Sequence, residues 1–402
     1  MNNKIYVLLL CCIASACSLK TNKEGQPLKV TLLSSPAKAK SAEPFLFTGK
    51  DGMVYLSWIE KSGDNASLKF SSLQNAQWSE PQTIASGNSW FVNWADYPMM
   101  AVNGKQFVAH FLEKSGESTY AYDVKLTTSG DSGKTWTEPQ VLHDDKKKAE
   151  HGFVTLEPYG ENFLVTWLDG RNTVMEGMEG MDHHGGHHGA MSLRAAIIDS
   201  NGNKMNEWEL DNKTCDCCQT SAAIAEAGPV VVYRDRSDTE IRDISIVRFT
   251  DGRWTEPKSI YNDNWKIAGC PVNGPRVVAE GNKLAVAWFS AAADTAVVNV
   301  IFSTDGGATF GEPIRVDEGN AIGRVDISFL NRESVMVSWM EGGVIKAAQV
   351  KRDGTKSPSI IIASSSESRS SGFPQMTKSG NQLIFAWTDD SEKNIKVASL
   401  VF

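Results

Sequence analysis

The sequence lacks any concentration of positive charge. Its 402 residues include 40 lysines and arginines against 48 aspartates and glutamates, which gives a net charge of −8, and the basic residues are scattered along the chain. Proteins that bind nucleic acid usually carry a basic patch that neutralises phosphates. The composition therefore argues against nucleic acid as a partner.

Long apolar runs are absent after the first residues. The run over residues 5–13, preceded by Lys4, has the length of a signal-peptide core and is too short to cross a bilayer as a helix. The residues that follow, Ala14-Ser15-Ala16-Cys17, fit the lipobox of a bacterial lipoprotein better than they fit plain secretory cleavage. We therefore predict a signal peptide over residues 1–17, with lipid on Cys17.

This leader sets the expected location of the protein. A polar tether, residues 18–27, joins it to the part expected to fold, residues 28–402. We expect a monomer held outside the cytoplasm in the bacterial cell envelope, at the outer membrane or in the periplasm. Its contact with the membrane would run only through the lipid on Cys17.

Cysteine is scarce in the mature chain. Three of the seven cysteines belong to the leader, and the others lie close together in sequence, at Cys215, Cys217, Cys218 and Cys270. In an oxidising compartment two disulfides are the default expectation, for instance one that joins the first group to Cys270. The alternative is a thiolate metal site completed by Cys270 or His151, although Cys-x-Cys-Cys departs from the usual spacing of zinc ligands. Both interpretations remain open at this point.

A short apolar segment that ends in an aromatic residue recurs seven times. Its β-branched and aromatic content, with Gly or Asn before each run, indicates strands. Each segment sits in a unit of four expected strands, which is the pattern of a β-propeller blade. The seven segments end at Trp58, Phe111, Trp167, Tyr233, Trp288, Trp339 and Trp387.

The two ends of the chain complement each other. The last unit stops at Phe402 after its third strand, and Val30-Thr31-Leu32-Leu33-Ser34 resembles the missing fourth strand. We predict that this segment pairs with residues 395–400, because such pairing removes two exposed sheet edges. The predicted fold is all-β, a single propeller of seven four-stranded blades, with six blades and an irregular cap as the alternative.

Two turns between expected third and fourth strands share one motif. They are Ser129-Gly130-Asp131-Ser132-Gly133-Lys134-Thr135-Trp136 and Ser303-Thr304-Asp305-Gly306-Gly307-Ala308-Thr309-Phe310, and Thr250-Asp251-Gly252-Arg253-Trp254 is a shorter version. Such a turn places Asp on backbone N–H groups, Gly at positive φ and the aromatic ring between sheets. The motif resembles the Asp-box, or bacterial neuraminidase repeat, of the sialidase superfamily.

This resemblance implies a set of site residues. Sialidases of that superfamily carry a Phe/Tyr-Arg-Ile-Pro motif, an arginine triad for the substrate carboxylate, a Tyr–Glu nucleophilic pair and an Asp acid/base. This chain has no Arg-Ile-Pro, and Ala42-Glu43-Pro44-Phe45 stands where the motif would lie. The implied carboxylate clamp is Arg234, Arg276 and Arg324. The implied nucleophile is Tyr97 or Tyr233, with Glu240 as its base, and the implied acid/base is Asp96.

Loops on one face of the predicted ring gather polar residues. Loops between blades and loops between second and third strands point to the same face, where sites on rigid scaffolds commonly lie. Arginine among these residues suits an anionic or polyhydroxylated ligand such as a glycan. The residues are Asp96, His151, Cys215 to Cys218, Cys270 and Arg324 between blades, and Asp169, Arg171, Arg234 to Arg242, Glu341, Asp389 and Asp390 between strands.

The third unit contains a long loop rich in methionine and histidine. Thioether and imidazole ligands favour copper, with nickel and zinc behind it. The loop carries Met175, Met178, Met181, His183, His184, His187, His188 and Met191.

Three hypotheses follow from the sequence. The first is a sialidase-like glycoside hydrolase. The second is a binding protein that captures a glycan-like ligand, or copper or zinc, at the channel mouth without turnover. The third, an assembly scaffold, accounts for the propeller but not for the cysteines. The missing arginine motif favours the second over the first.

Overall fold

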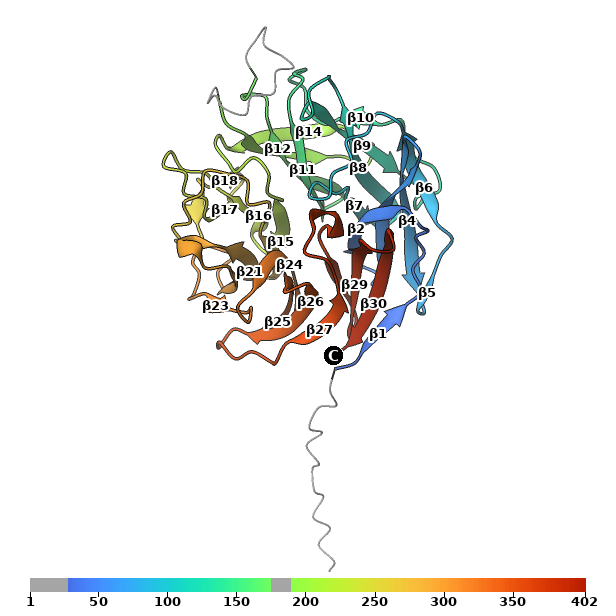
Figure 1. Cartoon of the computed structure of the whole chain (residues 1–402). Coiled ribbons are helices and arrows are strands. Elements are labelled where there is room, and N and C mark those ends of the chain that lie inside the picture. The colour runs from blue at the N-terminus through green and yellow to red at the C-terminus, as the bar shows by residue number, and fades with distance from the viewer. Residues whose placement is uncertain (1–27, 175–188) are drawn as a thin grey trace, which may run out of the picture.

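The computed structural model describes residues 28–174 and 189–402 and arranges them in seven antiparallel sheets around a central axis (Figure 1). The prediction of an all-β propeller with seven blades is confirmed. Helix is confined, within these residues, to two short 3-10 turns, η1 (Ala292–Asp294) and η2 (Arg369–Ser371). No helix in the described part is long and apolar enough to cross a membrane.

The first four blades are consecutive in sequence, and each begins with its innermost strand. The first contains β2 (Ser41–Thr48), β3 (Val54–Ser62), β4 (Asn65–Gln74), β5 (Gln77–Trp78) and β6 (Gln82–Gly87). The second contains β7 (Met100–Asn103), β8 (Gln106–Lys114), β9 (Tyr122–Ser129) and β10 (Gln140–Val141). The third contains β11 (His151–Tyr159), β12 (Asn162–Asp169), β13 (Ser192–Ile198) and β14 (Lys204–Asp211). The fourth contains β15 (Ser221–Ala225), β16 (Gly228–Arg234), β17 (Ile244–Thr250), β18 (Arg253–Trp254) and β19 (Lys258–Ser259).

The remaining blades complete the ring. The fifth contains β20 (Arg276–Glu280), β21 (Lys283–Ser290), β22 (Val297–Ser303) and β23 (Ile314–Arg315). The sixth contains β24 (Ala321–Asn331), β25 (Ser334–Glu341), β26 (Val344–Lys351) and β27 (Ile360–Ser364). The seventh contains β28 (Gln375–Ser379), β29 (Gln382–Asp389), β30 (Asn394–Val401) and β1 (Val30–Leu33).

The ring is closed by pairing between the two ends of the folded chain. Strand β1 lies antiparallel to β30, with Val30 opposite Leu400 and Leu33 opposite Val397. This is the predicted pairing, and it leaves β30 bonded on both sides. The blade therefore holds the ring together through backbone hydrogen bonds rather than through side chains alone.

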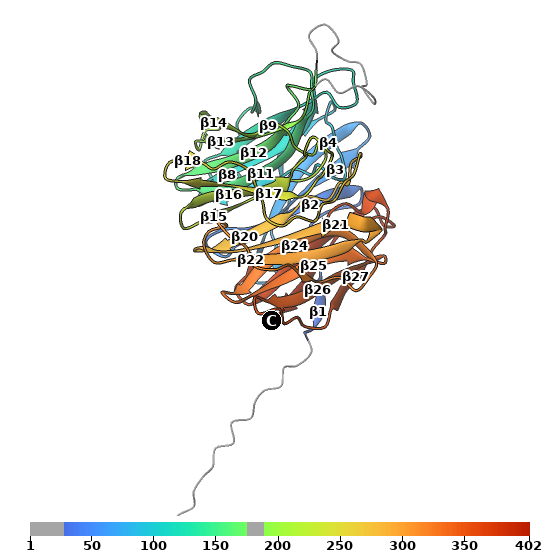
Figure 2. The same ribbon diagram turned by 90° about the vertical axis from the view of Figure 1, so that its left-hand side faces the viewer.

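The second strand of each blade forms the core between sheets. Its aromatic residue is buried in every blade, and Trp58, Trp167 and Trp288 are fully inaccessible. These strands are covered on both faces, which explains why they read as nearly continuous apolar runs. Figure 2 shows neighbouring blades stacked face to face.

The predicted turn at residues 129–136 forms as the motif requires. Asp131 accepts hydrogen bonds from the Thr135 backbone N–H (2.9 Å) and hydroxyl (2.7 Å). Gly133 has a φ of 81° and donates its N–H to Ser129 Oγ. The Trp136 ring lies 6.1 Å from that of Phe70 in the first blade. The turn thus joins two neighbouring blades, which is a structural role.

Candidate functional site

The innermost strands enclose a central cavity of about 250 Å³. Strands β2, β11, β15, β20, β24 and β28 all contribute to its wall, so residues from six blades meet there. Polar and apolar side chains share the lining almost equally. The ionisable side chains on the wall are Glu157, Arg276 and Asp326.

Arg276 at the start of β20 is the cation of this cavity. Its Nη2 donates to Tyr97 Oη (2.5 Å) and to Gln375 Oε1 (3.0 Å), and its Nε lies 3.8 Å from Asp326 Oδ1. Burial by itself would lower the pKa of Arg276, but the nearby Tyr97, Asp326 and Glu157 outweigh it and raise that pKa. Its Nη1 makes no hydrogen bond to any described residue, so one face of the guanidinium is available to a ligand.

Two carboxyl groups share the cavity wall with this arginine. Burial raises the pKa of Glu157 to about 8, although Arg276 acts in the opposite direction. Burial also raises the pKa of Asp326, which accepts the N–H groups of Ile327 and Met376. With that pKa, Glu157 keeps its proton near neutral pH and is able to act as a general acid.

Arg234 and Arg324 do not join Arg276, although the sequence grouped all three. Arg234 is 1% exposed and donates to the carbonyl groups of Asn273, Arg242 and Phe289, with its guanidinium 4.8 Å from the Trp265 ring. Among the described residues, these three arginines share no acceptor.

Arg324 is likewise occupied by the fold. It donates to the Gly372 carbonyl (2.9 Å) and the Ser371 hydroxyl (2.7 Å), and its guanidinium lies 4.9 Å from the Trp94 ring. Burial lowers the pKa of Arg324 to about 10, and Arg369 contributes in the same direction. Both arginines therefore fasten loops between blades, because a guanidinium group satisfies several carbonyl groups at once.

Tyr233 and Glu240 do not form the implied nucleophile and base. The Tyr233 side chain is 1% exposed, and its hydroxyl donates to Asp211 Oδ2 at 2.5 Å. Glu240 instead pairs with Arg236 (2.9 Å) and Arg242 (3.0 Å), and hydrogen bonding to Arg236 is the main cause that lowers the pKa of Glu240. Tyr97, the other candidate nucleophile, does lie beside Arg276.

Asp96 serves as a backbone cap between blades. Its Oδ1 accepts the Phe153 N–H at 2.8 Å, where Phe153 has a φ of 52° and the register with β12 shifts. Asn273 caps Arg324, which has a φ of 53°, in the same way at 2.7 Å. Burial raises the pKa of Asp96 to about 7, but both of its oxygens already have partners inside the protein.

A further carboxyl group, that of Glu150, lies near Asp96 and was not identified from the sequence. The Tyr122 hydroxyl donates to Glu150 Oε1 at 2.8 Å and approaches Asp96 Oδ2 at 3.4 Å. Burial raises the pKa of Glu150 to about 8, with smaller contributions from Asp96, Asp216 and Cys270. Glu150 therefore lies between the Asp96 cap and the cysteine loop. No local motif marks it, because its neighbours come from three different loops between blades.

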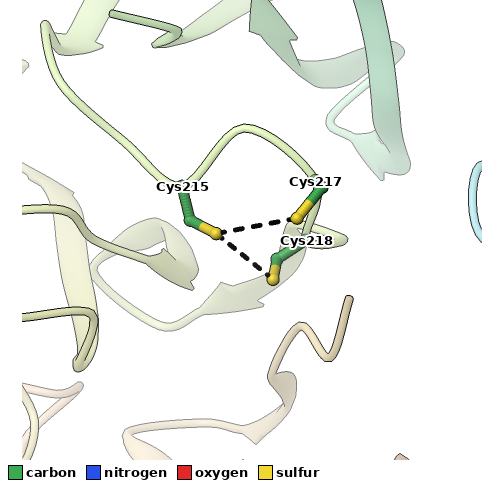
Figure 3. Close-up of side chains that lie close together, drawn as sticks. All are labelled: Cys215, Cys217 and Cys218. Carbon is green, nitrogen blue, oxygen red and sulfur yellow. Dashed lines mark hydrogen bonds between the residues drawn. The ribbon is translucent and has the colours of Figure 1, made fainter. Parts of the chain in front are cut away.

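The loop between β14 and β15 brings three thiols together. Figure 3 shows Cys215, Cys217 and Cys218 with their sulfur atoms turned toward one another. The Cys215 sulfur lies 3.5 Å from that of Cys218 and 4.0 Å from that of Cys217. All four cysteines of the described part are free thiols, so the expected disulfides are not formed in this structure. The fourth, Cys270, is exposed, and its thiol interacts with that of Cys217.

His151 belongs to a different cluster from the cysteines. Its ring stacks on His143 with centroids 3.5 Å apart, and Asp145 bridges the two imidazoles at 2.5 Å and 3.2 Å. Despite their burial, hydrogen bonds to Asp123 and Asp145 raise the pKa of His143 to about 9. The expected completion of the thiolate site by His151 is therefore not formed.

Most of the predicted methionine and histidine ligands lie outside the described residues. These are Met175, Met178, Met181, His183, His184, His187 and His188, and Cys17 of the leader also lies outside. Met191 is described, and it differs from the expectation. Its side chain is 2% exposed within the core, and its carbonyl accepts the Thr214 N–H. Met191 is therefore part of the blade rather than of a metal-binding loop.

Comparisons with known proteins identify the fold. No protein-family description matches the sequence, and no curated protein matches it either. Among solved structures, the polysaccharide lyase Uly1 has a TM-score of 0.54 at 9% identity, over 90% of each chain. The α-L-arabinofuranosidase Arb93A of Fusarium graminearum has a TM-score of 0.51 at 10% identity, over 93% of this chain and 97% of that chain. A polysaccharide lyase of family PL25, an ulvan lyase bound to -[GlcA(1-4)Rha3S]-, has a TM-score of 0.50 at 13% identity, over 77% of this chain and 79% of that one. At these identities the likeness is one of fold, and it assigns no activity to this chain.

Proposed function

We propose that this protein binds an acidic sugar unit of a glycan in its central cavity. The observation that carries the proposal is Arg276, a largely buried guanidinium whose Nη1 bonds to none of the described residues, on the wall of a cavity of about 250 Å³. Ligand pockets commonly exceed about 300 Å³, so this one suits a single sugar ring rather than a long chain segment. A guanidinium recognises carboxylate or sulfate through charge-assisted hydrogen bonds. The carbohydrate chemistry of the structural neighbours supports the same class of ligand.

Binding of acidic and neutral oligosaccharides to the purified protein tests this proposal. Arg276→Met keeps the side-chain length and removes the charge, and it is expected to weaken binding of a uronate- or sialate-terminated glycan at least 10-fold, the equivalent of about 1.4 kcal/mol. Arg253→Met, at an exposed position in the short strand β18, is the matched control and is expected to leave binding unchanged. Unchanged affinity in a folded Arg276→Met protein would place the ligand elsewhere.

Hydrolysis is a second candidate function, favoured by the protonated carboxyl at Glu157 and the hydroxyl of Tyr97 next to Arg276. A sialidase-type reaction needs a general acid for the leaving group, and removal of such a group typically costs 10²–10⁴-fold in rate. We therefore expect any release of sugar from a sialoside or uronide reporter to fall by about that factor in Glu157→Gln. A wild-type protein that binds the reporter without cleaving it is a binding protein only.

We also propose that lipid on Cys17 holds the propeller outside the cytoplasm. The sequence Ala14-Ser15-Ala16-Cys17 after a short apolar run supports it. Expression with a labelled fatty acid is expected to mark the wild-type protein, and Cys17→Ser is expected to abolish the label and release the protein from membranes. A membrane fraction unchanged by Cys17→Ser rules the anchor out.

A further inference from the structure

The spacing of the three sulfur atoms in the β14–β15 loop fits shared coordination. A disulfide bond joins sulfur atoms at about 2.05 Å. Thiolates around a tetrahedral ion with metal–sulfur bonds of about 2.3 Å lie about 3.8 Å apart, as the edges of that tetrahedron. The distances from Cys215, 3.5 Å to Cys218 and 4.0 Å to Cys217, bracket this value. All three sulfur atoms also lie within 4.8 Å of one another.

The loop that holds these thiols is fixed before any ion binds. The backbone N–H of Cys215 donates to the Arg234 carbonyl at 3.0 Å, and that of Thr214 donates to the Met191 carbonyl at 2.9 Å. At the other end, the Gln219 amide donates to the Ala95 carbonyl. Cys215 and Cys218 are 1% and 2% exposed. Because the fold already orders this loop, an ion that binds there does not have to order it, and this favours tight binding.

The charged side chains around the thiols favour a bound cation. Arg242 Nη1 donates to Cys215 Sγ at 3.2 Å, a contact that stabilises a thiolate. Arg242 and Arg236 are themselves paired with Glu240, and Arg236 also with Asp216 at 3.2 Å. These two arginines and two carboxylates cancel, and the remaining nearby cation of the described part, Arg234, brings one charge against several thiolates. A bound metal ion would offset part of the remaining negative charge.

We propose that Cys215, Cys217 and Cys218 bind one Cu(I) ion, with Cys270 as a fourth and exchangeable thiolate. Sulfur-only donors select soft ions, which excludes Mg²⁺, Ca²⁺ and Mn²⁺. Closed structural zinc sites use Cys-x2-4-Cys pairs, whereas here two ligands are adjacent in sequence and the fourth is exposed. Cys270 comes from the loop between β19 and β20, so the ion links two loops between blades. This site is separate from the sugar cavity, and neither proposal depends on the other.

Titration of the reduced, full-length mature chain with Cu(I) under anaerobic conditions tests the site. A coloured Cu(I) chelator serves as competitor, and thiolate-to-Cu(I) absorption serves as a second readout. We expect one Cu(I) per chain. The double replacement Cys217→Ser with Cys218→Ser is expected to weaken binding by more than about 100-fold, beyond the 10–100-fold cost of losing an outer-shell group. Cys270 is an exchangeable ligand and Arg242 contacts a ligand from outside, so Cys270→Ser and Arg242→Met are each expected to weaken Cu(I) binding by about 10–100-fold.

A matched control separates this site from the histidine-rich segment. Replacement of His183, His184, His187 and His188 by Ala is expected to leave the tight Cu(I) equivalent and its thiolate absorption in place. Circular dichroism confirms that each variant is folded. The proposal is overturned if Cu(I) binding follows these histidines instead of the cysteines, if the cysteines bind Zn²⁺ and retain no Cu(I), or if reduced protein binds no Cu(I) and isolated protein contains two disulfides.

Discussion

Single residues at the entrances to the blades carry conformations that the local sequence does not explain. Gly152 precedes Phe153, and a Cβ at Gly152 would lie 2.0 Å from Asp96 Oδ2. Gly323 precedes Arg324, and its Cβ would lie 2.3 Å from Asn273 Oδ1. In both cases glycine lets a polar side chain of another blade reach the next N–H group. Asp96 and Asn273 are thus equivalent, and their common role is to fix the entry of an inner strand.

The carboxyl group of Glu157 is expected to make the free energy of unfolding depend on pH. The ordinary carboxyl pKa is about 4.3, and that of Glu157 in the folded protein is about 8. Between these values the folded state keeps a proton that the unfolded state releases, so the free energy of unfolding falls as pH rises through this window. Glu157→Gln is expected to flatten that fall. Urea midpoints of both proteins at about pH 5 and about pH 8.5 measure the difference, and parallel pH dependences would contradict the raised pKa.

At the scale of elements, the turn between third and fourth strands depends on neighbouring blades as well as on its own sequence. Gly133 has a positive φ, and a Cβ there would lie 2.4 Å from the Phe70 ring. Gly307 repeats the arrangement, with its Cβ 2.8 Å from Ile246 in the preceding blade. The glycine is therefore required twice, once by the positive φ of the backbone and once by the packing of the preceding sheet.

Gly133→Ala and Gly104→Ala separate these two requirements. Gly104 also has a positive φ, of 64°, but a Cβ there would contact nothing within 4 Å. We expect Gly104→Ala to cost about 1 kcal/mol, from backbone strain alone. Gly133→Ala is expected to cost at least about 1 kcal/mol more, because overpacking adds to the strain. Chemical denaturation measures both, and equal costs would show that Phe70 moves aside freely.

One strand from the N-terminal part of the described chain, β1, closes the whole molecule into a ring. Strand β1 supplies the outer strand of the seventh blade, and its loss would leave the backbone groups of β30 unpaired at a sheet edge. The hydroxyls of Thr48 and Thr377 also meet at 2.7 Å, so the first and seventh blades touch near the axis as well.

Deletion through residue 34 is expected to destabilise the propeller and to expose an edge that self-associates. A chain that begins at residue 28 retains β1 and is the matched control, expected to keep the melting temperature of the mature protein. Thermal denaturation together with size-exclusion chromatography measures both effects. A monomer of unchanged melting temperature after deletion through residue 34 would refute a stabilising role of β1 in ring closure.

The sequence by itself determined the seven blades and their closure. Aromatic residues such as Trp58 and Trp387 end apolar runs that recur seven times, and such runs are typical of strands buried on both faces. The turn at residues 129–136 could also be predicted from the sequence, because its hydrogen bonds join residues that are at most four positions apart. The gathering of Cys215, Cys217 and Cys218 also followed from their nearness in the chain.

Only the tertiary structure decided which polar residue does what. Arg234, Arg276 and Arg324 look alike in sequence, but the first and last meet backbone carbonyls, whereas Arg276 meets a cavity. Glu157 and Asp326 interrupt apolar inner strands, a signal that could have marked them as cavity residues. Glu150 had no such signal. The physical reason is that a propeller brings together loops more than 50 residues apart, as in the hydrogen bond from Phe153 to Asp96, so burial and partners are set by the ring and not by the segment.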